Sequence, residues 1–270
     1  MSYYFVILAI LLIVIIIAIS YYIYYIYKNT DSFDINNVYF MTSKETKSFL
    51  LKDEDNYVNN LTKYDLYARK VKSSNEYLNN ISNSSIDFSK EEISRLTKCS
   101  YDADKFFRNL SDKYLNGKDI SKIKWIYSIT DKNVYEEGLP HTRMNIIFLS
   151  NKIFKNTDNE LTSTLIHEKI HIYQRYNPIL FNKIIASMNY SIVDKSSIEK
   201  NHLIRSNPDV NNNIYIDNNT KKLLVCKYRN EKPNSINDVI INSFAIEHPY
   251  EKIAYDIANY YNDISKYINI

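Results

Sequence analysis

The five residues from His167 to His171, with the sequence His-Glu-Lys-Ile-His, constrain this chain more than any other stretch. On an α-helix, positions four apart lie on one face, a single turn from each other. Two imidazoles at that spacing can bind one Zn²⁺ through bonds of about 2.0–2.1 Å. The glutamate after the first histidine then lies beside the open coordination position and can accept a proton from water. Because the chain has only five histidines, we interpret His167 and His171 as zinc ligands and Glu168 as the general base.

The residues around this motif predict a helix of ordinary length. From Leu161 to Tyr176, apolar residues recur at helical spacing without glycine or proline. Thr157 and Glu160 match the capping box that precedes many helices, and Pro178 disfavours continuation at the other end. The alternative is a surface helix with two incidental histidines. It fits poorly, because the apolar positions indicate a largely buried helix, and buried His and Glu side chains need partners.

Composition bounds the class of protein. Once an N-terminal apolar segment is set aside, about 240 residues remain, enough for one sizeable domain or two small ones. A net charge of +3 is too mild to indicate nucleic-acid binding, and 24% charged with 14% aromatic residues is typical of a globular chain. Cys99 and Cys226 make no disulfide framework, although one bridge between them stays open. The 26 tyrosines and 2 glycines indicate an AT-rich genome and nothing about mechanism.

The first 28 residues predict a single-pass membrane anchor. Residues 3–27 contain no charged residue, and residues 5–19 are an unbroken apolar run, long enough as a helix to exceed a hydrocarbon core of about 30 Å. Tyrosines cluster at both ends, as in the aromatic belts of spanning helices. A cleaved signal peptide is the alternative, with Ala18-Ile-Ser20 as a cleavage pattern. However, no Lys or Arg precedes the run, and hydrophobicity continues past that point.

The membrane side of the large domain stays open, with the cytoplasm favoured. Lys28, Lys44 and Lys47 follow the apolar segment, and no Lys or Arg precedes it, which places the domain inside by the positive-inside rule. Glycosylation sequons would instead indicate a lumenal domain, for example Asn60-Leu-Thr62, Asn83-Ser-Ser85 and Asn109-Leu-Ser111. In a chain this rich in Asn and Ser such triplets are expected by chance.

Beyond the anchor, the pattern predicts an α+β protein. We expect a linker at 29–41, a helical subdomain at 42–120 and a catalytic domain at 121–270. Within the catalytic domain we expect strands at Lys124–Thr130, Met144–Leu149, 214–216 and 223–228, and helices at 178–193 and 249–267 as well as the motif helix.

A catalytic zinc needs a third protein ligand, which must lie farther along the chain. The extended pattern with a third histidine downstream of the motif is absent, because Arg175, Asn177 and Pro178 occupy that region. Carboxylates are the natural candidates, among them Glu251, which opens the C-terminal helix and whose alternative role is to complement the helix dipole. Four competing ligands stay open: Glu247, His248, His202 and Asp209. Asp256 is a candidate hydrogen-bond acceptor for a ligand imidazole.

In this region the chain resembles the gluzincin branch of the zincin zinc metallopeptidases. In that family a downstream helix supplies a glutamate ligand, often with a small residue one turn later that packs against the first helix. Glu251 followed by Ala254 matches this scheme, and Pro249 suits a helix start. The 80 residues between His171 and Glu251 exceed the spacing of compact gluzincins. The resemblance covers His167–Tyr176, Gly138–Leu149 and Glu247–Ala258, and does not extend to residues 30–120.

The resemblance also implies how substrate binds. In zinc peptidases of this type, an edge strand just ahead of the metal helix pairs with the extended substrate backbone. Ile146, Ile147 and Phe148 are our candidates for that strand, with an ordinary core strand as the alternative. Motif and composition together also resemble membrane-anchored metallopeptidases of large DNA viruses.

These observations lead us to expect a membrane-anchored zinc metallopeptidase, with Zn²⁺ held by His167, His171 and Glu251. Glu168 accepts the proton of water and passes it to the leaving amine. His248, Tyr255 and His141 are unranked candidates for stabilising the oxyanion. Two other functions stay open: a non-catalytic membrane or virion assembly protein on a zincin scaffold, and a zinc-dependent amidase acting on a non-peptide substrate.

Overall fold

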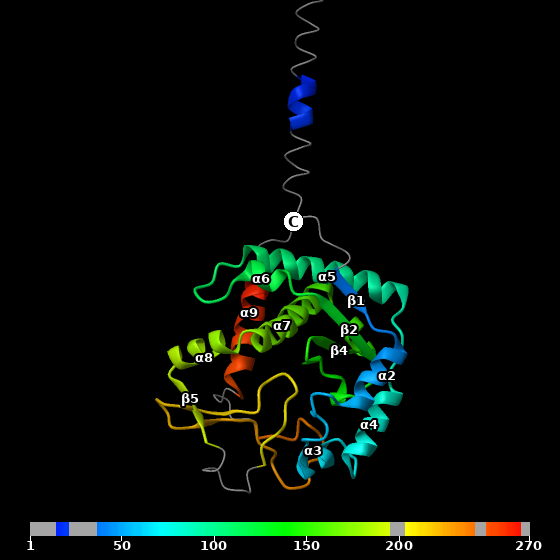
Figure 1. Cartoon of the computed structure of the whole chain (residues 1–270), viewed down its shortest axis with the longest axis vertical. Coiled ribbons are helices and arrows are strands. Elements are labelled where there is room, and N and C mark those ends of the chain that lie inside the picture. Colours follow the sequence, from blue (N-terminus) through cyan, green and yellow to red (C-terminus); the bar gives the residue numbers. More distant parts are fainter. Residues whose placement is uncertain (1–14, 22–36, 195–202, 241–246, 266–270) are drawn as a thin grey trace, which may run out of the picture. The chain divides into compact units, whose positions relative to one another are not determined.

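The computed structural model describes residues 15–21, 37–194, 203–240 and 247–265 (Figure 1). The chain divides into two units, Met1–Ile35 and Asn36–Ile270. In the first unit, residues 15–21 are helical. In the described residues of the second unit, the α-helices and strands are, in chain order, β1 (Val38–Phe40), α2 (Ser43–Lys52), α3 (Lys63–Ala68), α4 (Ser74–Asn83), α5 (Lys90–Asn109), α6 (Gly117–Ser121), β2 (Trp125–Thr130), β3 (His141–Arg143), β4 (Ile146–Ser150), α7 (Asp158–Tyr176), α8 (Pro178–Ser187), β5 (Tyr190–Val193), β6 (Ile214–Asp217), β7 (Leu223–Leu224) and α9 (Pro249–Ser265). Short 3₁₀ helices lie at Glu136–Gly138 and Asn151–Lys155.

The described residues of this unit form two sheets, which confirms the α+β class. The larger sheet has the strand order β1-β2-β4-β3, in which β1, β2 and β4 run parallel and β3 is antiparallel to β4. The smaller sheet is an antiparallel arrangement of β5, β6 and β7 in chain order. Both segments expected to be strands ahead of the motif helix are strands, β2 and β4.

Helices cover both faces of the larger sheet, and alternate residues of β4 face opposite sides. Ile147 and Leu149 belong to the main hydrophobic core with residues of α5, α7 and α9. Ile146 and Phe148 belong to a second core with residues of α2 and α4. Figure 1 shows α7 and α9 on one side of the strands and α2 and α4 on the other. This arrangement explains why β4 reads as a continuous apolar run, because it is buried on both faces.

The motif helix α7 begins and ends where the sequence predicts. The Thr157 side chain accepts a hydrogen bond from the Glu160 main-chain N–H, and the Glu160 carboxylate accepts one from the Thr157 N–H, which forms the full capping box. The helix ends at Tyr176, and Pro178 occupies the first turn of α8.

Helix α9 packs along α7. At one end Ser163 Oγ donates to the Ala258 carbonyl at 3.5 Å, and at the other Gln174 Nε2 donates to the Tyr250 carbonyl at 2.9 Å. The two helices therefore run antiparallel, which brings the first turn of α9 beside the second half of α7. The predicted C-terminal helix is confirmed over Pro249–Ser265.

Two sequence expectations about elements need correction. Residues 190–193, expected to continue a helix from 178, form strand β5, because α8 ends at Ser187 and Asn189 adopts a positive φ of 62°. Residues 38–40, expected as linker, form β1 and pair with β2. The segment 42–109 is helical as expected, and it belongs to the same compact unit as residues 121–270.

The predicted membrane anchor falls mostly outside the described residues, which include only 15–21 of that segment. Within the described part of the chain, we find no helix with the length and apolar character required to cross a membrane. Both cysteines are free thiols, with Cys99 buried in the main core.

Candidate metal centre

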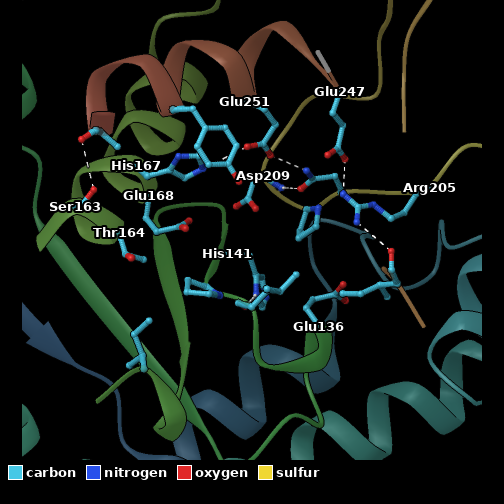
Figure 2. Close-up of a pocket in the computed structure, with 18 of the residues that line it drawn as sticks. Glu136, His141, Ser163, Thr164, His167, Glu168, Arg205, Asp209, Glu247 and Glu251 are labelled. Atoms are coloured by element: carbon cyan, nitrogen blue, oxygen red, sulfur yellow. Dashed lines mark hydrogen bonds and ion pairs between the residues drawn. The ribbon is translucent and has the colours of Figure 1, made fainter. Parts of the chain in front are cut away.

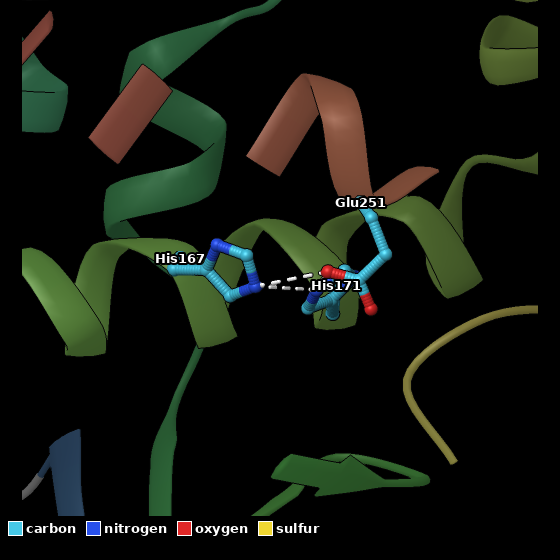
Figure 3. Close-up of side chains that lie close together, drawn as sticks. All are labelled: His167, His171 and Glu251. Carbon is cyan, nitrogen blue, oxygen red and sulfur yellow. Dashed lines mark hydrogen bonds and ion pairs between the residues drawn. The ribbon is translucent and has the colours of Figure 1, made fainter. Parts of the chain in front are cut away.

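Three side chains predicted as metal ligands converge between α7 and α9 (Figure 3). His167 and His171 project from one face of α7, and Glu251 from the first turn of α9. The Nε2 atoms of the two imidazoles lie 2.9 Å apart, and Glu251 Oε2 lies 3.3 Å from His167 Nε2 and 3.4 Å from His171 Nε2. One atom from each side chain therefore faces a common point.

These separations fit a tetrahedral zinc site. Bonds of about 2.0–2.1 Å at tetrahedral angles place ligand atoms about 3.3–3.4 Å apart. The two distances to Glu251 match this spacing, and the distance between the imidazoles is somewhat shorter. Two imidazoles and one carboxylate form the donor set of catalytic zinc sites that leave a fourth position for water.

The orientation of His171 is fixed by a neighbour that the sequence reading missed. Gln174 Nε2 donates to the Tyr250 carbonyl, so its Oε1 is left to accept a hydrogen bond from His171 Nδ1, at 2.9 Å. His171 therefore carries its proton on Nδ1, and the lone pair of Nε2 faces the other two ligands. Gln174, which is fully buried, thus links the second histidine to the helix that carries Glu251.

The second oxygen of Glu251 is held separately. Asn207 Nδ2 donates to Glu251 Oε1 at 2.6 Å, which leaves Oε2 toward the imidazoles. Asp256, expected as an acceptor for a ligand imidazole, instead pairs with Lys252 at 2.6 Å on the outer face of α9. That expectation is wrong, because Asp256 lies one helical turn from Lys252 and on a more exposed face than Glu251.

The electrostatics of the ligand pair follow from burial and proximity. Burial opposes ionisation of Glu251, but the charges and hydrogen bonds of His171 and His167 outweigh it and hold the pKa of this carboxyl well below its ordinary value. Burial alone would lower the pKa of His171, and the adjacent Glu251 raises it overall. The carboxylate is therefore ionised, as a metal ligand must be.

Glu168 lies beside the ligands on the same helix and lines a cavity of about 440 Å³ (Figure 2). Its Oε2 is buried and has no hydrogen-bond partner among the described residues. Burial, together with the negative charges of Asp209 and Glu251, raises the pKa of Glu168 well above its ordinary value. A carboxylate with raised proton affinity at the edge of a cavity has the properties of a general base.

Of the three candidates for stabilising the oxyanion, two line this cavity and one does not. His141 and Tyr255 line it with Glu168, whereas His248 lines a neighbouring cavity and accepts a hydrogen bond from the Tyr250 N–H. His141 Nδ1 lies 3.0 Å from the Leu139 carbonyl, which can only accept. Because burial lowers the pKa of His141, its Nε2 is a hydrogen-bond acceptor at neutral pH and does not suit an oxyanion. Tyr255, whose ring centroid lies 4.4 Å from that of His167, is the remaining donor.

The competing third ligands are occupied elsewhere. Glu247 forms an ion pair with Arg205 at 2.5 Å, and Asp209 accepts hydrogen bonds from the main chain and hydroxyl of Thr142. His202 lies outside the described residues. Of the candidates that the structure describes, only Glu251 reaches both histidines of the motif.

We expected Ile146, Ile147 and Phe148 to form an edge strand that pairs with substrate, and this expectation is wrong. All three side chains are buried, and β4 lies between β2 and β3 with both edges paired. Among the described residues β3 is the edge strand on this side of the sheet. Its three residues, His141 to Arg143, follow a turn too closely to show a strand pattern in the sequence.

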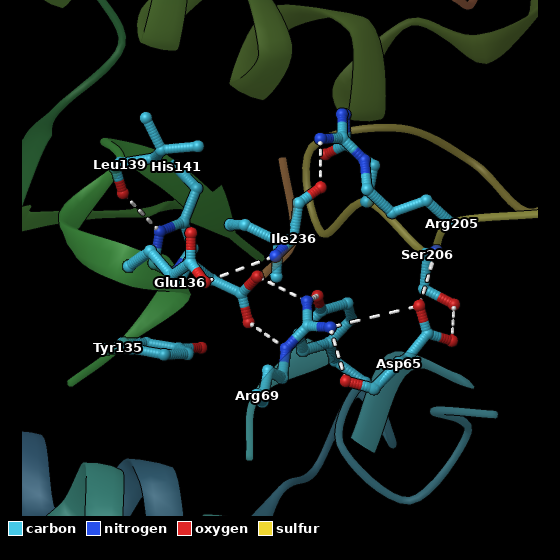
Figure 4. Close-up of polar contacts among 12 residues, drawn as sticks. Asp65, Arg69, Tyr135, Glu136, Leu139, His141, Arg205, Ser206 and Ile236 are labelled. Carbon is cyan, nitrogen blue, oxygen red and sulfur yellow. Dashed lines mark hydrogen bonds and ion pairs between the residues drawn. The ribbon is translucent and has the colours of Figure 1, made fainter. Parts of the chain in front are cut away.

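A segment far from the motif in sequence completes the wall of the cavity. Residues 205–209, which we name the strap, include Asn207 and Asp209 and have no regular secondary structure beyond a turn. The strap is attached to a buried charge network (Figure 4): Asp65 accepts hydrogen bonds from the Ser206 N–H and hydroxyl, and Arg69 forms an ion pair with Glu136. The role of Gln174 could have been predicted from the sequence, because Gln174 lies three positions after the ligand His171 on the same helix. The role of the strap could not, because its contacts are all distant in sequence.

We compared the chain with models of known protein families, with curated proteins and with solved structures, and none of the three comparisons returned a match.

Proposed function

We propose that this chain is a zinc-dependent hydrolase of peptide bonds, of the zincin type. The observation that carries the proposal is the convergence of His167, His171 and Glu251 on one point. Glu251 Oε2 lies 3.3 and 3.4 Å from the two imidazole Nε2 atoms, and Glu168 lies beside them at a cavity. The fixed proton on His171 and the ionised Glu251 support it, because zinc binds neutral imidazole and carboxylate.

Each group has a distinct task in this proposal. Zinc held by the three ligands would lower the pKa of water to about 7 and polarise the scissile carbonyl. Glu168 accepts the proton of the attacking water and delivers it to the leaving amine, for which its raised pKa is suited. Tyr255 Oη is the candidate donor to the oxyanion that develops on the carbonyl oxygen.

The experiment combines metal content with hydrolysis, using the full-length chain. Elemental mass spectrometry is expected to find one zinc per chain in wild type. His167→Ala and Glu251→Ala are expected to lose this zinc. His248→Asn is the matched control, because this histidine lies outside the ligand group and is expected to retain zinc. Absence of zinc from wild type, or retention in Glu251→Ala, contradicts the ligand assignment.

Glu168→Gln separates metal binding from catalysis. The amide preserves size but cannot take a proton, so zinc is expected to stay while hydrolysis of a peptide mixture falls by at least 10²-fold, the low end for general-base catalysis. Full activity of Glu168→Gln contradicts the proposal. If wild type and Glu168→Gln both bind zinc and neither hydrolyses peptides, the result would indicate a non-catalytic membrane or virion assembly protein. Hydrolysis confined to non-peptide amides would indicate a zinc-dependent amidase.

A further inference from the structure

The edge of β3 nearest the proposed zinc site is already occupied by side chains of this chain. In an antiparallel pair, alternate residues direct their main-chain groups toward the partner strand and away from it. Thr142 is the middle residue of β3, and both of its outward groups have partners. Its N–H donates to Asp209 Oδ1, and its carbonyl accepts from Arg175 Nη2 at 2.9 Å.

These two side chains take the places that the main chain of an added strand would fill. A carboxylate oxygen replaces the carbonyl acceptor, and a guanidinium N–H replaces the amide donor. Arg175 also donates to the Thr142 hydroxyl at 2.6 Å and to the Met144 carbonyl at 3.2 Å. Before Thr142, Pro140 has no N–H to offer, and the Leu139 carbonyl is taken by His141. An extended peptide therefore finds no free donor at Thr142 or Pro140.

The strap that supplies Asp209 is held at each of its residues. Its contacts are Arg205 to Glu247 and the Ile236 carbonyl, Ser206 to Asp65, Asn207 to Glu251, the Pro208 carbonyl to Arg175, and Asp209 to Thr142. Asp65 is fully buried and also accepts a hydrogen bond from Tyr228. Displacing the strap would break these hydrogen bonds together and remove a partner from each of the buried carboxylates of Asp65 and Glu251, which is unfavourable. The strap is therefore a wall of the cavity that is costly to displace.

The remaining space suits a compact ligand. The cavity of about 440 Å³ lies within the range of small-molecule sites. On α7 it is lined by Ser163, Thr164, His167 and Glu168, all on the N-terminal side of His171, and the strap lines it from the other direction. Figure 2 shows the Asp209 carboxylate between Glu251 and His141, at the strap wall.

We infer that the site cleaves short peptides and free chain ends that fit inside this cavity, and does not cleave internal bonds of an extended polypeptide paired with β3. This inference rests on the proposed function.

The first experiment uses the full-length, zinc-loaded chain and a mixture of peptides of 3 to 20 residues, with products identified by mass spectrometry. Parallel mixtures carry acetylated N-termini, amidated C-termini or both. Cleavage is expected within three residues of an end, and blocking the end that enters the cavity is expected to slow it at least tenfold. Cleavage of internal bonds at rates independent of length and of blocking overturns the inference and leaves the proposed function standing. Zinc binding without cleavage of any peptide contradicts the proposed function and the inference with it.

A pair of variants tests the occupied edge itself. Asp209→Ala and Asp209→Asn both remove the charge, but only Asn retains an oxygen that can accept the Thr142 N–H. We expect Asp209→Ala to raise the ratio of internal to terminal cleavage at least threefold over Asp209→Asn. Zinc content and circular dichroism confirm that both variants are folded. An equal ratio in the two variants overturns the role assigned to the Asp209–Thr142 contact.

Discussion

At the scale of single residues, the proposed site depends on side chains that orient the ligands as well as on the ligands. His171 is held by Gln174, and Glu251 by Asn207, at 2.9 and 2.6 Å. Each hydrogen bond selects which atom of the side chain faces the proposed metal position. His167 differs, since its Nδ1 is buried without a hydrogen-bond partner among the described residues, and its ring packs against Tyr255 instead. Its orientation therefore comes from ring packing and from the contact of its Nε2 with Glu251.

We predict that Gln174→Met weakens zinc binding 10- to 100-fold, the usual effect of losing a partner of a metal-bound histidine. Methionine has a similar volume but cannot accept the His171 proton or donate to Tyr250. The dissociation constant, measured by competition with a chromophoric chelator, checks this. Gln174→Glu is the control, because it retains the acceptor and is expected to bind zinc more tightly than Gln174→Met. Equal affinities of wild type and Gln174→Met would show that Gln174 serves packing alone.

At the scale of elements, α7 carries the two proposed histidine ligands and the proposed general base, so what holds its first turn in place matters to the site. The capping box at Thr157 satisfies main-chain N–H groups of the first turn, and Asp158 pairs with Arg95 of α5 at 2.7 Å. The start of the helix is thereby attached to a neighbour as well as capped.

We predict that Thr157→Ala lowers the free energy of unfolding by about 1 kcal/mol, the typical value of an N-cap side chain. Thr164→Ala makes the same chemical change inside α7, where the hydroxyl donates to the Glu160 carbonyl of the preceding turn. We expect it to cost less than Thr157→Ala. Urea denaturation followed by circular dichroism measures both. A larger loss in Thr164→Ala would contradict the capping role.

At the scale of the whole molecule, a buried ion pair joins three elements of the main core. Lys169 Nζ of α7 lies 2.6 Å from Asp104 Oδ1 of α5 and 3.9 Å from the ring centroid of Trp125 in β2. Trp125 Nε1 donates to the other Asp104 oxygen at 3.0 Å. Burial lowers the pKa of Lys169 from 10.5 to about 8, although Asp104 opposes this. The interior thus destabilises the charged lysine more than its partner stabilises it.

This shift predicts a pH dependence of stability. Between pH 8 and 10.5 the unfolded chain holds a proton on Lys169 that the folded chain has lost, so stability rises with pH across that window. The gain from pH 8 to pH 10 is about 2 kcal/mol, measured against the Lys169→Met/Asp104→Asn double variant, which lacks both titrating groups. Urea denaturation at pH 8, 9 and 10 gives the difference. A difference that stays constant or falls over this range would contradict the assignment.

We also propose that residues 3–27 attach the chain to a membrane, because this uncharged segment is long enough to span one as a helix. The full-length chain is expected in the membrane fraction after an alkaline carbonate wash, and a chain that begins at residue 36 in the soluble fraction. The compact unit Asn36–Ile270 has its own cores, so the shortened chain is expected to fold. Recovery of the full-length chain in the supernatant would contradict the anchor.

Many of the helices and strands, and the shared helix face of His167 and His171, follow from local sequence. The spacing of His167 and His171, the Thr157 capping box and the apolar run of β4 each act over a few residues. The residue periods of helices and strands allow such features to be predicted without knowing which distant segment they pack against. The edge position of β3 was missed, because strand order depends on pairings between distant segments.

The sequence by itself determined α7, its boundaries and the shared face of its two histidines, because helix geometry and capping are local. Only the tertiary structure decided that Glu251 reaches both imidazoles, that Gln174 and Asn207 orient the ligands, and that Asp209 occupies the edge of β3. Apart from Gln174 with His171, these contacts join residues 44 to 84 positions apart, such as Thr142 with Asp209 at a separation of 67. Such contacts form through packing of whole elements, which no local pattern encodes.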